Sequence, residues 1–406
     1  MKKWISFICI CTLLVSLAAC APMNPVEKET AQTQQGGASH TDWKTEINEL
    51  KKPNPADLPE HLTLEVSEYF QIDTDFAVSH ELENYQVSEL EIKQHLFDLD
   101  KDFDKLLHLA GNPVIKEKSS LVSDELLPDG SETKVEHARL DNDNFIQLRD
   151  GRFLICRYLD TVYSTIGVPS PYSGENSSEE DICGDVFKEG EELSFMPASD
   201  ARQQIGELLE GMGIDHFPEM KSYACTQKEL QEQVDQTIEY WQLTGRDQNE
   251  IDAMIQTVKP EDEGYCIVAE QGYQGIPYYS LGVGESVVNF SGMLGTQLDF
   301  LVTPQGILSG EAAGLYDFVE AKEAEDILSA GEILDTFITL HNDTTGKSRI
   351  KVTHTGLAYL PVLKDKKKML FDAVPIYYVI YGQSNEGAES MRRNVNLFDA
   401  RTGEQL

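Results

Sequence analysis

Residues 373–381 read Ala-Val-Pro-Ile-Tyr-Tyr-Val-Ile-Tyr, a run in which β-branched and aromatic side chains dominate. Such side chains are enriched in strands, so the run predicts a long β-strand. Two further strand-like runs flank it, Arg349–Leu360 before and Asn394–Asp399 after, and the chain then closes on the turn Thr402-Gly403-Glu404. The C-terminal part of the chain is therefore expected to form an antiparallel sheet.

Helices and hairpins precede this sheet in the sequence. Asp150-Gly151 lies between the apolar runs Phe145–Leu148 and Phe153–Cys156, which is the pattern of a tight β-hairpin. Apolar residues at helical spacing follow four helix-start signals, at Ser88–Glu91, Ser199, Thr226–Glu229 and Ser329–Glu332. The first of these helices is expected to run on to Ala110, where Gly111-Asn112-Pro113 ends it. Together the elements predict an α+β fold of two domains, each an antiparallel sheet with packed helices.

Residues 170–194 separate the two predicted domains. The stretch loses the periodicity of its neighbours, and eight Asp and Glu residues crowd around Gly184 and Gly190. We therefore expect an N-terminal domain over residues 61–195 and a C-terminal domain over residues 196–406.

The first 20 residues, MKKWISFICICTLLVSLAAC, have the pattern of an export signal. Two lysines precede an apolar run that is too short to span a bilayer, and small residues follow it. The ending Leu17-Ala18-Ala19-Cys20 resembles the lipobox of bacterial lipoproteins. This resemblance implies that residues 1–19 are removed and that the thiol of Cys20 carries a diacylglycerol, whose palmitate-like chains hold the protein at the outer face of the cell membrane. The alternative is an ordinary signal peptide with an unmodified Cys20.

Residues 20–60 are predicted to be a lipidated N-terminus and a flexible tether. The stretch is polar, as in Thr30–Gly37 and Lys52–Pro55, and it holds too few apolar side chains to offset the entropy lost on ordering. The anchor thus determines where the protein is, and the tether leaves the orientation of the folded body open.

The acidity of the chain limits the classes of partner. The 406 residues include 70 Asp and Glu against 33 Lys and Arg, which is a formal net charge of −37. A body this acidic has no broad basic face for phosphates, which argues against nucleic-acid binding. Such a body also repels anionic lipid headgroups, so membrane contact is assigned to the lipid on Cys20. Lys364–Lys368 is the strongly basic run, and it is expected at a hairpin tip.

The cysteines leave two interpretations open. Beyond Cys20 and the signal, the chain contains Cys156, Cys183, Cys225 and Cys266. An even number in an exported protein permits two disulfides in one of three connectivities, and reduced thiols are equally compatible with the sequence. No C-x-x-C pair is present for redox or zinc chemistry.

Residues 298–406 resemble PepSY-type domains and the related fold of the YycH and YycI regulators of a membrane histidine kinase. The likeness rests on a strand pair turning at Pro304–Gly306, a helix, long strands around Ile376–Ile380, and the ending Asp399–Glu404, which matches the family's Asp-Ala-x-Thr-Gly-Glu. It implies an extracytoplasmic, non-enzymatic module that restrains or senses a membrane partner. The chain departs from YycH and YycI because it has a lipid anchor where they have a transmembrane helix. It is also similar to uncharacterised lipoproteins of gut Clostridia.

Catalytic and metal-binding motifs do not fit the sequence. Asp98–Asp104 lacks the Gly at position six and the Glu at position twelve of an EF-hand loop. Thr345–Ser348 resembles the end of a P-loop, but its first glycine is missing and a helix precedes it where a strand is required. Neither G-x-S-x-G nor H-E-x-x-H occurs. The chain is therefore predicted to be non-enzymatic, with no metal or cofactor; a hydrolase would require a closed pocket of carboxylates or a histidine with a perturbed pKa.

Two groups of tyrosines form the candidate binding surface: Tyr273, Tyr278 and Tyr279, and Tyr377, Tyr378 and Tyr381. Exposed tyrosines bind sugars or protein partners well, whereas tyrosines in a strand can also simply alternate between core and surface. We predict a membrane-anchored extracytoplasmic lipoprotein with a non-enzymatic binding or regulatory role towards a membrane or cell-wall protein. The alternative is a substrate-capturing lipoprotein for a transporter, which would use the region Tyr273–Tyr279.

Overall fold

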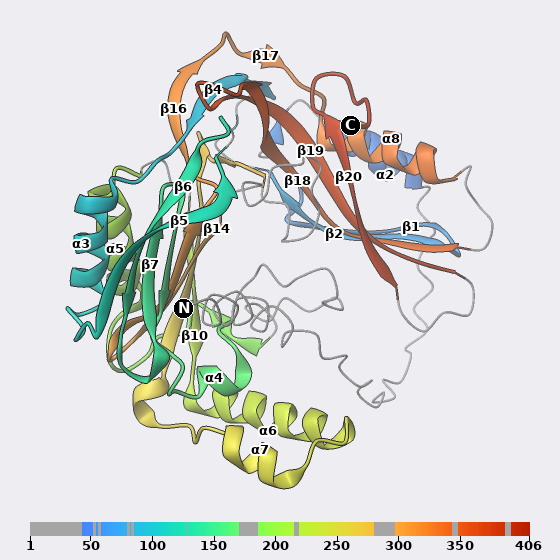
Figure 1. Ribbon diagram of the computed structural model, residues 1–406. Coiled ribbons are helices and arrows are strands. Elements are labelled where there is room, and N and C mark those ends of the chain that lie inside the picture. The colour runs from blue at the N-terminus through green and yellow to red at the C-terminus, as the bar shows by residue number, and fades with distance from the viewer. Residues whose placement is uncertain are drawn as a thin grey trace.

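The computed structural model describes residues 43–51, 54–55, 58–78, 82, 85–127, 129–169, 186–214, 219–279, 297–342, 348–385 and 391–406. The predicted signal peptide, Cys20 and Cys183 lie outside these residues. Within them, helices pack on two large sheets whose strands are mostly antiparallel, so the α+β fold class is confirmed. Figure 1 shows the two sheets as separate layers, each with its own helices.

The nine-stranded sheet has the order β5-β6-β7-β8-β15-β14-β11-β10-β9. Its strands are β5 (Glu117–Leu126), β6 (Glu132–Arg139), β7 (Phe145–Arg149), β8 (Arg152–Cys156), β9 (Lys188–Glu189), β10 (Glu219–Cys225), β11 (Gly264–Glu270), β14 (Gln297–Thr303) and β15 (Gly306–Ala313). All of its pairs are antiparallel, and most join strands that are neighbours in the sequence. The predicted hairpin at Asp150-Gly151 is confirmed, because Arg149 pairs with Arg152 across it.

Helices cover both faces of the nine-stranded sheet. On one face lie α3 (Leu99–Leu109) and α5 (Ala198–Gly211), which bury Phe103 and Ile205 against sheet residues such as Phe153. On the other side lie α4 (Tyr163–Ile166), α6 (Gln227–Leu243) and α7 (Gln248–Met254). Figure 1 shows α3 beside α5, and α6 with α7 at the lower end of the molecule.

The seven-stranded sheet combines strands from both ends of the chain. Its order is β1-β2-β18-β19-β4-β16, and β20 also pairs with β19. The strands are β1 (His61–Ser67), β2 (Phe70–Ala77), β4 (Leu90–Gln94), β16 (Tyr316–Ala321), β18 (Ser348–Asp365), β19 (Leu370–Asn385) and β20 (Arg392–Asp399). β2 and β18 are parallel, with Phe70 opposite Ile350. Two small pairs accompany the large sheets: β12 (Gly272–Tyr273) with β13 (Ile276–Pro277), and β3 (Gln86–Val87) with β17 (Glu325–Asp326).

Two helices, α2 (Trp43–Leu50) and α8 (Ala330–Asn342), pack beside each other on the seven-stranded sheet. Phe337 of α8 is fully buried, and its ring lies 6.0 Å from that of Phe70 and 5.1 Å from that of Tyr381. Gly331 allows the helices to approach closely, since a Cβ there would lie 2.5 Å from the backbone carbonyl carbon of Leu50. A larger residue at this position would force the helices apart.

Three chain segments cross between the two sheets and are bonded to one another. The segment after β4 meets the segment before β16, because the His95 N–H donates to the Leu315 carbonyl at 2.9 Å. Gln271 follows β11 and is 1% exposed. Its side-chain amide donates to the Tyr316 carbonyl at 2.7 Å and accepts from the Tyr316 N–H at 2.8 Å. The crossings therefore form one hydrogen-bonded junction.

The helix predicted from Ser88 to Ala110 is wrong in its first half. Leu90–Gln94 is strand β4, in which Leu90 and Ile92 are buried, and it pairs with β16 and β19 from the C-terminal part of the chain. The helix itself begins at Leu99, and Asp98 caps it by accepting a hydrogen bond from the Lys101 N–H. The helical spacing of the apolar residues continued by chance into a strand whose partners lie far away in the sequence.

The other helix starts lie close to their predicted positions. Thr226 and Glu229 form a complete capping box at the start of α6, and Ser329 and Glu332 exchange the same bonds before α8. At α5 the helix begins at Ala198 rather than after a Ser199 cap, because the Glu192 carboxylate accepts from the Ala198 N–H at 2.8 Å. A distant side chain thus replaces the local cap.

The prediction of a flexible tether is wrong for residues 43–50. Trp43–Leu50 forms α2, with Ile47 and Leu50 buried against the seven-stranded sheet. Trp43, Ile47 and Leu50 stand at helical spacing, so the signal was present within a polar stretch.

The sheets do not follow the predicted division of the chain at residue 195. β8 precedes this position and pairs with β15, so Cys156 lies opposite Ser309 in one sheet. The strands of the nine-stranded sheet fall within residues 117–313, and those of the seven-stranded sheet within 61–94 and 316–399. Residues 298–406 are likewise shared, since β14 and β15 belong to one sheet and β18–β20 to the other.

Candidate functional site

Four of the six tyrosines of the predicted binding surface are buried. Tyr377 is 0% exposed, and Tyr278, Tyr279 and Tyr381 are between 3% and 8% exposed. Burial raises the pKa of the Tyr377 hydroxyl well above its usual value, and the hydroxyl has no hydrogen-bond partner in the described part of the chain. The tyrosines therefore do not form the exposed surface that the sequence suggested.

Several of these rings pack where the chain crosses between the sheets. Tyr273 stacks flat on Phe318 with centroids 4.9 Å apart, and Tyr278 meets Tyr316 edge-on at 5.5 Å. Tyr279 lies 5.2 Å from Tyr378. These contacts join the segment after β11 to the seven-stranded sheet, so these tyrosines stabilise the junction.

Three of the four cysteines are buried thiols: Cys156, Cys225 and Cys266. The arrangement with two disulfides is thereby wrong. The Cys266 thiol donates to the Pro169 carbonyl at 3.1 Å, and burial raises the pKa of the Cys156 thiol to about 11. A thiol whose pKa is raised by burial is a poor nucleophile at neutral pH, which indicates a packing role.

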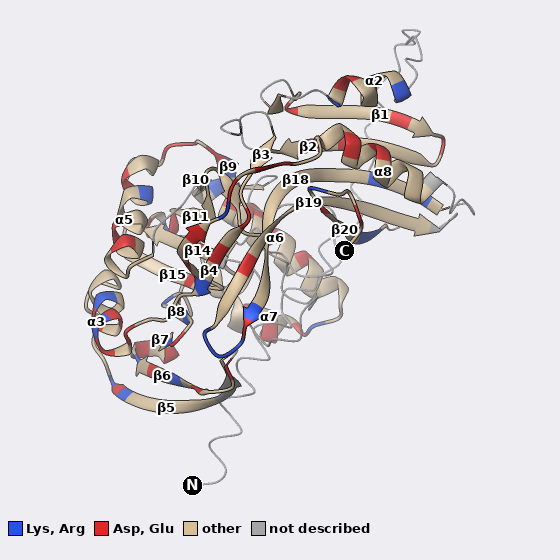
Figure 2. Ribbon diagram, turned by 90° about the horizontal axis from the view of Figure 1, so that it is seen from above, with Lys and Arg blue, Asp and Glu red and all other residues tan. Residues whose placement is uncertain are grey.

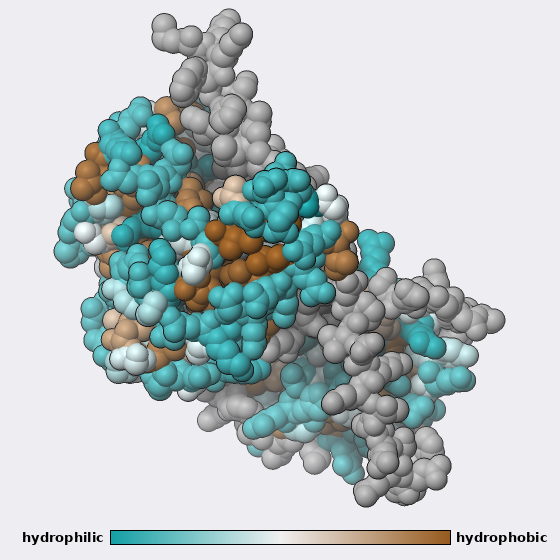
Figure 3. All heavy atoms as spheres, turned by 90° about the horizontal axis from the view of Figure 1, so that it is seen from below, coloured by the Kyte–Doolittle hydropathy of each residue, from teal (hydrophilic) through white to brown (hydrophobic). Residues whose placement is uncertain are grey.

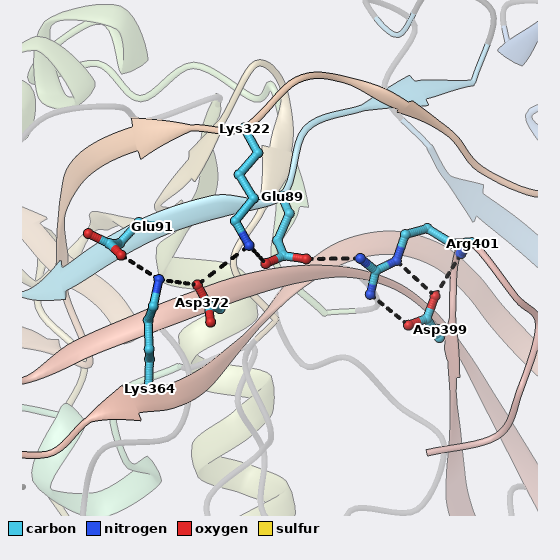
Figure 4. A network of polar contacts seen from close by, with 7 residues as sticks. All are labelled: Glu89, Glu91, Lys322, Lys364, Asp372, Asp399 and Arg401. Atoms are coloured by element: carbon cyan, nitrogen blue, oxygen red, sulfur yellow. Dashed lines mark hydrogen bonds and ion pairs between the residues drawn. The ribbon is translucent and has the colours of Figure 1, made fainter.

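A network of seven charged side chains lies on the seven-stranded sheet (Figure 4). Arg401 links Asp399, at one end of the network, to Glu89, because its guanidinium donates to each of these carboxylates at 2.9 Å. Lys322 also binds Glu89. These contacts tie the C-terminal turn to the segment before β4, so the Asp399–Glu404 ending has a structural role here.

Lys364 belongs to the other part of this network. The predicted hairpin tip is confirmed for Lys366–Lys368, which lie in the turn between β18 and β19, whereas Lys364 lies within β18. It pairs with Asp372 at 3.1 Å on the neighbouring strand β19 and with Glu91 at 2.5 Å on β4, the next strand beyond β19. Burial raises the pKa of Asp399, but hydrogen bonds from Arg401 outweigh it and hold that pKa below its usual value. Every carboxylate of the network faces a cation, which indicates a structural network rather than an acid–base pair.

The exposed edge of the nine-stranded sheet is the strongest candidate for a binding site. Among the described strands, β6 alone pairs with β5, so this ten-residue strand is the edge of the sheet within the described part of the chain. Figure 2 shows β5 along the lower margin of the molecule, beyond β6. At the opposite edge, β9 has only two residues. A long open edge is a template for a further strand.

Apolar side chains are exposed along this edge, which we name the β5 edge (residues 114–122). Val114 is 74% exposed, Leu121 53% and Val122 60%. Proteins commonly protect a sheet edge with charge or proline, and here the charges lie at the two ends of β5, in Lys116–Lys118 and Asp124–Glu125. The middle of the strand, residues 119–122 with the sequence Ser-Ser-Leu-Val, contains neither charge nor proline. The sequence shows these residues but not that their strand is an edge, since edge position depends on the pairing of all the other strands.

Two searches of the described residues bear on other site types. No group of three or more His, Cys, Asp or Glu is placed to hold a metal ion in this part of the chain. Nor do the described residues include a helix of the length and apolarity that membrane crossing requires.

Comparison with known proteins adds a likeness of fold. No family model matches the chain, and no curated protein matches it. A crystal structure of an uncharacterized protein from Eubacterium rectale ATCC 33656 is similar, with 19% sequence identity and a TM-score of 0.68. The match covers 91% of this chain and 99% of that one. At this identity the likeness concerns the fold alone.

Proposed function

We propose that the protein is a lipid-anchored extracytoplasmic binding protein that takes up an extended segment of a protein partner on its β5 edge. The observation that carries the proposal is that β5 is the edge strand of the nine-stranded sheet among the described strands, with Leu121 and Val122 more than half exposed. Strand addition to such an edge combines backbone hydrogen bonds with contacts of alternate side chains. The role is non-enzymatic, and binding would restrain or recruit the partner.

The N-terminal sequence supports a location at the membrane. Residues 1–20 have the pattern of a lipoprotein signal, and the polar residues 21–42 would link Cys20 to α2. A partner anchored in the same membrane or in the cell wall would then lie within reach of the body. A chain in which Cys20→Ser is substituted should no longer incorporate labelled palmitate and should leave the membrane fraction.

The β5 edge indicates what the partner segment must offer. Neighbouring residues of a strand point to opposite faces, so Leu121 and Val122 offer one apolar contact on each face. Full burial of such a side chain contributes roughly 1.5–3 kcal/mol. The partner should therefore present an extended segment with an unpaired backbone and apolar side chains on both faces.

Site-specific crosslinking in the protein's own bacterium tests this proposal. A photoreactive amino acid at Ser120 should capture one membrane or cell-wall protein reproducibly. The double substitution Leu121→Lys with Val122→Lys should abolish the capture, because two charges on the edge oppose strand addition. Val362→Lys is the matched control, since Val362 is 43% exposed on β18 of the other sheet.

The outcomes separate the interpretations. Loss of capture in the edge variant with retention in the control supports binding at the β5 edge. Capture that survives the edge variant, or no capture above background, contradicts it. Capture of a permease would instead favour substrate delivery to a transporter.

A further inference from the structure

The β5 edge is one of several places where apolar groups reach the surface, so apolar contact alone does not select a partner. Figure 3 shows a continuous apolar band on another face, the one seen from below, bordered by hydrophilic side chains. Specific recognition at the β5 edge therefore requires side chains that favour one segment and oppose others. Charged side chains act in both ways.

The part of β5 that can direct a further strand is six residues long. β5 pairs with β6 in one register from Glu117 to Val122, and the register shifts before Leu126. Glu117 and Leu121 point to one face, because strand residues separated by an even number point the same way. Lys118 and Val122 point to the other face. Each face of the edge thus carries one charge and, four residues further on, one apolar group.

The charge of Lys118 is held in place and is not neutralised within the sheet. Its ammonium lies 4.6 Å from the centroid of the Phe103 ring, on the face that α3 covers. The residue opposite it on β6 is Ala138, which is fully buried and carries no charge. Lys118 is exposed and forms no ion pair with another described residue. A strand on the outer side of β5 would therefore meet this positive charge.

The charge of Glu117 is not neutralised by its neighbour on β6 either. Glu117 is exposed, and the residue opposite it is Arg139. The Arg139 guanidinium donates to Asp143 at 2.6 Å, so it is bound to another carboxylate. None of the described residues forms an ion pair with Glu117. The edge thus presents a negative charge on one face and a positive charge on the other.

A further strand should run antiparallel to β5, as all the pairs of the nine-stranded sheet do. Directly opposite side chains lie on the same face about 5 Å apart, where opposite charges attract and like charges repel. An antiparallel strand meets Val122 first and Glu117 last. It therefore needs two apolar residues, two residues of any kind, an acid opposite Lys118 and then a base opposite Glu117.

We propose that the β5 edge selects an extended segment with the order apolar-apolar-x-x-acidic-basic, bound antiparallel to Glu117–Val122. The inference rests on the proposed function, because it names the sequence class of the partner segment. A shift by two residues would place the acid opposite Ser120, which is uncharged, or opposite Lys116, whose ammonium already binds Asp141 at 2.7 Å. The charges thus determine the register as well as the partner.

Three synthetic peptides of identical composition test the proposed order. The first contains Val-Val-Ser-Ser-Glu-Lys, the second contains Val-Val-Ser-Ser-Lys-Glu, and the third contains the first sequence in reverse, all within the same flanking residues. Each carries a fluorescein label and is titrated with the full chain carrying Cys20→Ser while fluorescence anisotropy is measured. We expect the first peptide to bind about tenfold more tightly than either of the others, because the second places like charges opposite each other on both faces.

A charge-exchange variant of the protein makes the test reciprocal. Glu117→Lys with Lys118→Glu leaves the net charge unchanged, and it should reverse the preference so that the second peptide binds more tightly than the first. The matched control is Lys188→Glu with Glu189→Lys, the same exchange between exposed neighbours on β9 at the opposite edge of the sheet. It should bind like the parent. Circular dichroism confirms that each variant is folded.

The outcomes separate this inference from the proposed function. Equal affinity for the first two peptides, or an unchanged preference in the variant at Glu117 and Lys118, overturns the charge order. If that binding is still lost in Leu121→Lys with Val122→Lys, the edge binds segments of another order and the proposed function stands. Tighter binding of the third peptide overturns the antiparallel assignment. No peptide binding overturns the inference alone if crosslinking from Ser120 captures a partner, and both proposals if it does not.

Discussion

The two sheets differ in how far apart in the chain their strands lie. In the nine-stranded sheet, β5 to β8 follow one another as hairpins, and β14 and β15 form another. In the seven-stranded sheet, β2 pairs with β18 and β4 with β19, although most of the chain lies between them. The nine-stranded sheet is thus inserted between β4 and β16 of the other. Local signals can specify the first sheet, whereas the second requires the two ends of the chain to meet.

This difference predicts two cooperative units. The apolar core under α2 and α8 shares no residue with the cores around the nine-stranded sheet. Contacts between distant residues also form slowly, because the loop between them must be closed first. Each unit has one tryptophan of the described chain: Trp43 on α2 packs against the core under α2 and α8, and Trp241 lies half-buried on α6, so each unit has its own fluorescent reporter.

The largest expected effect comes from emptying one core. Phe337→Ala removes a fully buried ring that contacts Phe70 and Tyr381, and it should lower the free energy of unfolding of the seven-stranded unit by about 3–5 kcal/mol. The free energy of unfolding of the nine-stranded unit should change by less than about 1 kcal/mol. Urea unfolding measures both, with Trp43 as the one tryptophan in a chain with Trp4→Phe and Trp241→Phe, and Trp241 as the one tryptophan in a chain with Trp4→Phe and Trp43→Phe.

Phe153→Ala is the matched experiment in the other sheet. Phe153 is also fully buried, and its loss should shift the Trp241 transition and leave the Trp43 transition nearly unchanged. If both variants move both transitions equally, the molecule unfolds as a single unit and the comparison of two units is wrong.

A smaller effect is expected at the junction between the sheets. Gln271→Ala leaves the buried N–H and carbonyl of Tyr316 without their partners, and each unsatisfied group costs about 1–3 kcal/mol. Both transitions should move to lower urea concentration, because Gln271 contacts segments of both sheets. Gln274→Ala is the control, since Gln274 is exposed in the neighbouring turn. A loss confined to one transition would show that the junction belongs to that unit alone.

The comparison also explains what the sequence could predict. Asp150-Gly151 and the capping box at Thr226 are local devices, and both appear as predicted. Ile92 fits the helical spacing that continues through Leu96 and Leu99, and pairing with β16 and β19 makes its segment a strand. Their environment was decided by residues near the other end of the chain.

Site prediction failed for the same reason. A tyrosine-rich strand such as Tyr377–Tyr381 has the composition of a binding surface, and burial by α8 is a tertiary event. Conversely, Leu121 and Val122 read like any strand residues, and only the complete strand order shows that β5 is an edge. Which face or edge is free cannot be read from composition.

Acidic pH should weaken both units through half-buried histidines. Burial lowers the pKa of His341 in the seven-stranded unit and of His137 in the nine-stranded unit below the usual value of 6.5. The unfolded chain therefore binds protons more readily, and stability is lost as pH falls from about 6.5. His61 acts in the opposite sense, because hydrogen bonds from its ring to Asp75 raise its pKa.

Histidine variants separate these contributions. His341→Gln should flatten the pH dependence of the Trp43 transition between pH 7 and pH 5, and His137→Gln should do so for the Trp241 transition. An unchanged pH profile in either variant would show that its histidine is not responsible.

The smallest expected effect concerns the network that closes the seven-stranded sheet. Arg401→Ala removes the bonds to Asp399 and Glu89, but the side chain is 29% exposed, so water compensates part of the loss. We expect the free energy of unfolding that Trp43 reports to decrease by about 1 kcal/mol, and the one that Trp241 reports to stay unchanged. Arg392→Ala, an exposed position on β20 of the same sheet, should leave both transitions in place.

The double variant Arg401→Ala with Glu89→Gln tests whether the two side chains act as a pair. Its loss in free energy of unfolding should be smaller than the sum of the losses in the two single variants, because both single variants remove the same contact. Full additivity would mean that Arg401 and Glu89 stabilise the sheet independently, and the C-terminal turn would then be held by its own local bonds rather than by the N-terminal strand it contacts.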